Sequence, residues 1–183
     1  MYIASIARDP EFWLFDGNVV LLAQNRHAAF RVHKGVLSLH SEFFAGMFEH
    51  ELPNLSKELC KDENLDGCPT VPLEDTEYDI RQFLLVVYGK SRLKTPEETT
   101  FPILAALIRV GHKYGMHDVV NECTPYLRSI VPTTLDEYGQ VLAHQFSIDF
   151  APYHAVEALY VFRLIDLDAD DPHVLSFVLF LCA

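Results

Sequence analysis

The chain has 183 residues, of which 50% are hydrophobic and 12% aromatic, so it can bury the core of one domain or of one domain with an added segment. This composition excludes wholesale disorder. The formal net charge of −12 disfavours a nucleic-acid-binding protein, because each phosphate contact needs a nearby cation. The same charge suits basic protein partners.

A hairpin and two short helices are predicted first along the chain. The apolar run Val19–Ala23 and the alternating run Ala28–His33 predict two strands, with residues 24–27 as the turn between them. Helical spacing over residues 36–40 predicts a short helix, and Ser41 is expected to cap the next one. We expect that next helix to bury one aromatic-rich face, formed by Phe43, Phe44, Met47 and Phe48.

A charged stretch then separates the hairpin from a third strand. Residues 49–67 contain several charges with proline and glycine, so we expect a loop or an insertion there. Residues 71–74 predict the third strand. After it, either Asp75 or Thr76 is expected to cap a helix over residues 80–87.

The second half of the chain is predicted to be helical. Amphipathic periodicity indicates helices near 103–115, 119–130, 135–146 and 154–165. Pro125 interrupts the second of these, because proline removes a hydrogen bond and clashes with the preceding turn. The helix either kinks at that position or restarts with Thr124 as its N-cap.

The cysteines and the two ends of the chain bear on the compartment. The four cysteines form no CxxC pair, and the first residues lack the basic start and long apolar core of a signal peptide. We therefore expect the cytoplasm or the nucleus. The apolar residues 174–183 are too short to span a bilayer as a helix, so we expect no membrane association. They stop without a cap or a polar tail, so we expect a chain cut within a helix or a gene model that ends early, with a short tail anchor as the alternative.

The histidines raise the question of a metal or catalytic site. His27, His33 and His40 are expected on a turn, a strand end and a helix, and no HxxxH or CxxC pattern joins them. No GxSxG motif occurs, and the Gly-Lys-Ser at 89–91 lacks the earlier glycine of a phosphate-binding loop. We therefore expect no catalytic, metal-binding or cofactor-binding residues, and no cofactor.

The stretch from Asp16 to Phe48 resembles the BTB/POZ family. That pattern has an Asp-x-x-Val-Val start, then Phe-x-Val-His-Lys/Arg, an aliphatic pair, and Ser-x-x-Phe-x-x-Met-Phe. Here the matching residues are Asp16, Val19, Val20, Phe30, Val32, His33, Lys34, Val36, Leu37, Ser41, Phe44, Met47 and Phe48. Residues 71–90 look like the family's third strand and following helix, and residues 104–123 like its long helix pair. The segments 9–25, 66–71 and 133–138 look most like the large fungal group of BTB proteins.

The resemblance implies an α+β fold, the BTB/POZ fold, with a small sheet (the hairpin plus the third strand) flanked by a cluster of α-helices. It covers residues 12–130, and residues 131–183 are expected to form a partial helical C-terminal extension. It also implies a protein–protein interaction module rather than an enzyme, one that mediates homo- or hetero-oligomer assembly and serves as a cullin ubiquitin-ligase substrate adaptor. The alternatives are a BTB-type transcriptional co-regulator, and an enzyme or small-ligand binder.

The expected partners are a second copy of the chain and a cullin, and the candidate interaction surface has two parts. One is the segment before the first strand, where BTB dimers pack or exchange an N-terminal segment, although the same aromatics could instead cover the domain's own core. Its residues are Phe12, Trp13, Leu14 and Phe15. The other is Asn18 opposite Lys34, at a slot where many dimeric members carry an acid. The triplet 103–105 also lacks the acid that cullin-binding members often have.

Overall fold

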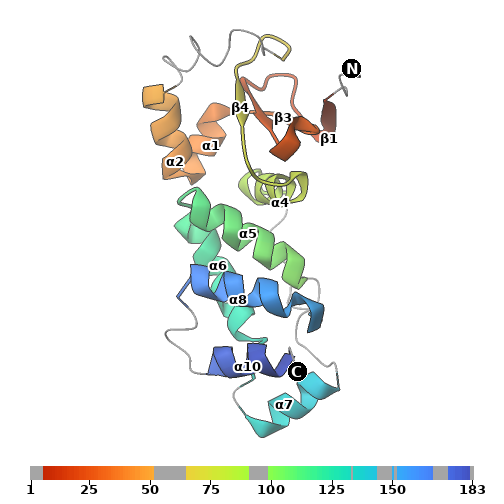
Figure 1. The fold of residues 1–183 in the computed structure, drawn as a ribbon. Helices are drawn as coiled ribbons and strands as arrows, with labels where there is room; N and C mark the ends of the chain where they lie inside the picture. The colour runs from red at the N-terminus through yellow and green to blue at the C-terminus, as the bar shows by residue number, and fades with distance from the viewer. Residues whose placement is uncertain are drawn as a thin grey trace. The chain divides into compact units, whose positions relative to one another are not determined.

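The computed structural model describes residues 6–51, 65–90, 99–132, 134–143, 150, 152–166 and 173–181. The chain divides into two compact units, unit 1 over Met1–Lys90 and unit 2 over Ser91–Ala183, and each is described by itself (Figure 1). Much of the predicted 49–67 loop and the end of the predicted 135–146 helix lie outside the described residues. No described helix is long and apolar enough to cross a membrane.

Unit 1 is built on a four-stranded mixed sheet with the order β1-β3-β2-β4. β2 (Val19–Leu22) and β3 (Ala28–Val32) form the predicted antiparallel hairpin through the 3-10 turn η1 (Gln24–Arg26). β4 (Thr70–Pro72), the predicted third strand, runs parallel to β2. These elements confirm the α+β prediction. The sheet has one strand more than we expected, because β1 (Ala7–Trp13) pairs in parallel with β3.

The helices of unit 1 begin at caps that the sequence indicated. Helix α1 (Lys34–His40) leads to α2 (Glu42–Gly46), and the Ser41 hydroxyl accepts the Phe44 N–H at 3.1 Å. Helix α4 (Glu77–Val87) starts at Thr76, whose hydroxyl accepts the Asp79 N–H at 3.1 Å. Thr76 is therefore the cap, rather than Asp75.

The aromatic face predicted for α2 is partly wrong. Phe44 and Met47 are buried, but Phe43 is 48% exposed. Helix α2 has five residues and passes into the π-helical segment η2 (Met47–Glu51). Neighbouring residues on a helix point about 100° apart, so a short helix with Phe44 inside turns Phe43 outward.

Unit 2 is helical in its described residues, with α5 (Phe101–Lys113), α6 (His117–Arg128), α7 (Leu135–Leu142), η4 (Pro152–His154), α8 (Ala155–Leu164) and α10 (His173–Leu181). Helix α5 packs on both α6 and α8, and α8 packs on α10 (Figure 1). Gly111 permits the close α5–α6 contact, because a Cβ there would lie 2.9 Å from Val120 Cγ2.

Helix α6 runs through Pro125 without a break, so the restart alternative is wrong. Thr124 lies inside the helix, and its hydroxyl donates to the Val120 carbonyl at 2.8 Å. Unit 2 also holds the helices that follow residue 131, together with α5 and α6. The boundary between the two compact units follows Lys90 and reflects contacts within the structure. The predicted division separates a BTB/POZ domain, residues 12–130, from an extension, residues 131–183, and it stays a prediction.

Candidate interaction surface

The turn that joins β1 to β2 crosses over the end of β3, because β3 lies between those two strands. Three backbone hydrogen bonds hold this turn, residues 14–18. The Leu14 N–H donates to the Arg31 carbonyl at 2.9 Å, and the Asn18 N–H donates to the Val32 carbonyl at 2.9 Å. Within the turn, the Gly17 N–H donates to the Leu14 carbonyl at 3.0 Å. The turn is thus fastened to β3 at both ends.

Gly17 is required where this turn meets β3. A Cβ at that position would lie 3.0 Å from the backbone carbon of Arg31 and 3.0 Å from the Val32 nitrogen. The Gly17 carbonyl accepts hydrogen bonds from Arg31 Nε at 2.9 Å and from Cys68 Sγ at 3.3 Å. The turn therefore lies directly on the strand, with no room for a side chain between them.

Asn18 and Lys34 do meet, but through backbone rather than through charge. The Asn18 Oδ1 atom accepts the Lys34 N–H at 2.8 Å. That N–H belongs to the first turn of α1, where backbone donors have no partner within the helix. The Lys34 ammonium instead lies 6.0 Å from the centre of the Phe48 ring. Asn18 therefore caps α1 from outside the helix.

His33 links the same turn to the end of α4. Its Nε2 lies 3.2 Å from Asp16 Oδ1, and its Nδ1 lies 3.0 Å from the Tyr88 hydroxyl. A carboxylate only accepts, so Nε2 is the donor in the contact with Asp16. Burial raises the pKa of Tyr88, and the Asp16 charge adds to this against the lowering effect of the His33 N–H. The phenol is thus a neutral structural group, which accepts the His33 backbone N–H at 2.9 Å, rather than an activated nucleophile.

The turn of residues 14–18, called the clamped turn below, presents Phe15 to solvent, with 88% of the residue exposed. Leu39, on α1, is 80% exposed. The neighbouring residues of the predicted surface are placed differently. Phe12 is fully buried, Trp13 and Leu14 are half-buried, Asn18 is exposed, and Lys34 is half-buried. The aromatic segment is therefore divided, since Phe12 belongs to the core of unit 1 and Phe15 lies on its surface, and its role in a dimer stays a prediction.

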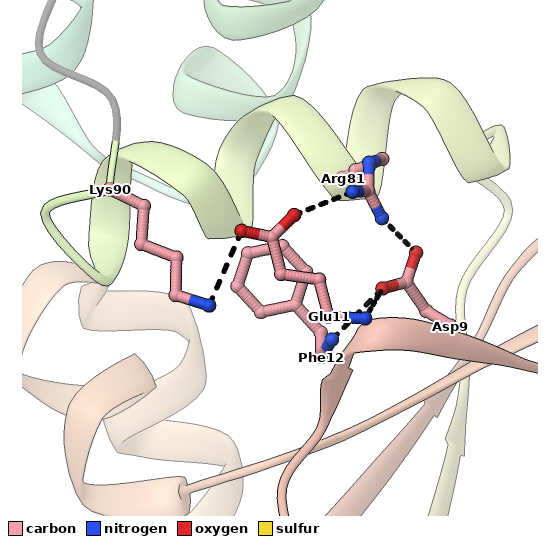
Figure 2. Close-up of polar contacts among 5 residues, drawn as sticks. All are labelled: Asp9, Glu11, Phe12, Arg81 and Lys90. Carbon is pink, nitrogen blue, oxygen red and sulfur yellow. Dashed lines mark hydrogen bonds and ion pairs between the residues drawn. The ribbon is translucent and has the colours of Figure 1, made fainter.

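A polar cluster that the sequence did not indicate fastens β1 to α4 (Figure 2). Asp9 pairs with Arg81, and Arg81 Nη2 lies 2.6 Å from Glu11 Oε2. Lys90 Nζ lies 3.3 Å from the other Glu11 oxygen. Phe12 is buried beneath these side chains, with its ring centre 4.8 Å from Lys90 Nζ. The partners are about 70 residues apart in the chain, so no local pattern could have paired them.

Comparison with known proteins agrees with this architecture. The family model of the BTB/POZ domain matches residues 14–130. The chain belongs to the BTB/POZ family. A search of curated proteins finds no match. The BTB match takes in the turn of residues 14–18, the hairpin, β4 and helices α1, α2, α4, α5 and α6, so Phe15, His33 and Leu39 all lie within the family domain.

BTB domains are protein-interaction modules. Among the residues that the structure describes, no three His, Cys, Asp or Glu side chains gather as a metal site would require. His33 is engaged by Asp16 and Tyr88, and His40 ends α1. The three histidines of the hairpin region thus have separate places in the fold.

Proposed function

We propose that this BTB protein is an interaction module that forms a homodimer through unit 1, with Phe15 as the central contact. The supporting observation is that a large aromatic side chain, 88% exposed, stands on a turn that is fastened to β3 and capped onto α1. A rigid aromatic anchor loses little conformational entropy on binding, which is why such residues dominate interface energies. Leu39 adds a second exposed apolar side chain to the same unit.

The dimer is tested by measuring molar mass with light scattering on the whole chain. We expect a dimer for the natural protein, and a monomer for Phe15→Ser and for Leu39→Ser. Both side chains are mostly exposed within a single chain, so each variant should keep the far-UV circular dichroism spectrum of the natural protein, while loss of the dimer should make its unfolding midpoint lower and independent of concentration. The matched control is Leu135→Ser, because Leu135 is 90% exposed but lies in unit 2.

Two results would contradict the dimer. One is a natural protein that stays monomeric across the concentration range, and the other is a dimer that both unit 1 variants leave intact. Trp13→Ala is a less informative variant, because Trp13 packs against the buried cluster around Val20 and under the Arg8 guanidinium, 4.6 Å away. Its loss would disturb the fold as well as any interface.

We further propose that the module acts as a substrate adaptor for a cullin ubiquitin ligase, in the cytoplasm or the nucleus. Membership of the BTB/POZ family supports this role. Leu104 and Ala105, in the triplet aligned with the family's cullin-binding residues, are buried in α5. A cullin would therefore have to contact other side chains. Pull-down with a recombinant cullin N-terminal region tests the role, and failure beside a working adaptor would contradict it.

The alternative role is that of a transcriptional co-regulator, which also works through protein contacts. The two roles predict different partners for the same domain. Affinity purification with mass spectrometry distinguishes them, because an adaptor should recover cullin and ligase subunits whereas a co-regulator should recover chromatin or repressor proteins. Fluorescent tagging of the whole chain gives the compartment independently.

A further inference from the structure

β1 is the edge strand of the sheet, and its middle does not follow the ladder of β3. Arg8 lies opposite Ala29 and Trp13 lies opposite Arg31, so β1 advances five residues while β3 advances two. Backbone pairing is therefore confined to the two ends of β1. The Ala7 N–H donates to the His27 carbonyl, and the Leu14 N–H donates to the Arg31 carbonyl, each at 2.9 Å. Something other than the ladder must hold the segment between them.

Asp9 shapes that segment. Its Oδ1 accepts the backbone N–H groups of Glu11 and Phe12, both at 2.9 Å, and so folds the chain into a tight turn. The turn sends Phe12 into the core of unit 1, where its ring lies 5.8 Å from that of Tyr88. The Asp9 side chain is only 2% exposed. A carboxylate this deeply buried is costly unless its charge is compensated.

The compensation comes from α4. Arg81 pairs with the second oxygen of Asp9 and with Glu11, and Lys90, just after the helix, pairs with Glu11 from the other side (Figure 2). Both cations also lie near the ring of Phe12, at 5.8 and 4.8 Å. Arg81 is the only one of the two cations that touches Asp9 in the described contacts, so it decides whether the buried charge is paired.

We propose that Asp9, Glu11, Arg81 and Lys90 form an ionic latch that keeps β1 docked as a cover over the outer edge of β3, and that β1 undocks alone when the latch is broken. The outer edge of β1 itself is a poor template for another strand, because Pro10 lacks an N–H and charged residues flank it. The strand β3 contains no proline, and its one charged residue is Arg31, near its C-terminal end. Its residues Ala28, Ala29 and Phe30 are buried and uncharged, so an undocked β1 would leave an edge that pairs with other strands.

The latch is tested by NMR-detected hydrogen exchange on the whole chain with Arg81→Gln. An uncompensated buried charge costs enough that the Ala7 and Leu14 amides should exchange on the order of 100-fold faster. The amides of β2 and α4 should keep the protection of the natural protein. Glu11→Gln, which spares the Asp9–Arg81 pair, should accelerate the same two amides by a smaller factor.

Arg109→Gln is the control, because Arg109 is about as exposed as Arg81 but pairs in unit 2 with Glu157, whose carboxylate is not buried as that of Asp9 is. It should leave Ala7 and Leu14 protected. Unchanged protection of both amides in Arg81→Gln would overturn the latch. So would an equal loss of protection in β1, β2 and α4, because β1 would then be an inseparable part of the sheet.

Discussion

Replacing Gly17 with alanine tests whether the clamped turn is as tight as the structure indicates. The added Cβ would meet Arg31 Cγ at 2.9 Å, which a flexible side chain can relieve. It would also meet the backbone of Arg31 and Val32 at 3.0 Å, and the end of an inner strand, paired on both sides, cannot easily yield there. Overpacking of this kind costs about 1–3 kcal/mol, and losing the Arg31–Gly17 hydrogen bond adds about 1 kcal/mol.

Urea denaturation monitored by tryptophan fluorescence measures this loss, because Trp13 is the only tryptophan in the chain and directly precedes the turn. Gly35→Ala is the matched control. Gly35 lies in α1, and a Cβ added there would have no atom within 4 Å, so alanine should raise the unfolding free energy by roughly 0.5–1 kcal/mol. If Gly17→Ala also left the unfolding free energy unchanged or raised it, the turn would not lie against β3 as described.

Three further results are expected. Burial, with a smaller effect of Glu122, raises the pKa of Cys123 from 9.0 to about 12, so the folded thiol keeps a proton that the unfolded chain releases. Stability should therefore fall as the pH rises from 9 towards 12, and Cys123→Ala should flatten that slope in urea titrations. Pro125→Ala should stabilise α6 by about 2 kcal/mol in thermal unfolding, since a proline costs about 3 kcal/mol within a helix and returns about 1 through the unfolded state. Ser41→Ala should lower the unfolding free energy by about 1 kcal/mol, because the Phe44 N–H loses its cap; an unchanged value would show that the cap contributes nothing.

The hairpin and the amphipathic helices could be predicted because their signals are local. Val19–Leu22 is fully buried, as its continuous apolar run indicated, and α4 buries the apolar face read from its spacing. The Ser41 cap follows the same logic. Such features depend on residues within one or two turns of each other, so a sequence carries them directly.

β1 was not predicted, because its residue types do not favour a strand. Residues 7–13 contain Asp, Pro and Glu, which are depleted in strands. The segment is held by contacts with α4, and Asp9 and Arg81 are 72 residues apart. The same limit applies to Phe12 and Phe15. They are three residues apart and chemically identical, yet one is buried and the other is on the surface.

Asn18 shows how a departure from the family pattern can keep a structural role while changing a surface. Many dimeric members carry an acid at this slot, and either side chain offers an oxygen that accepts a backbone N–H. Here that oxygen holds the Lys34 N–H at 2.8 Å, so α1 remains capped and the turn remains fixed. The amide removes one negative charge from the surroundings of Phe15, and the nearby Asp16 is engaged by His33. We therefore expect the proposed contact through Phe15 to depend more on apolar fit than on charge pairing.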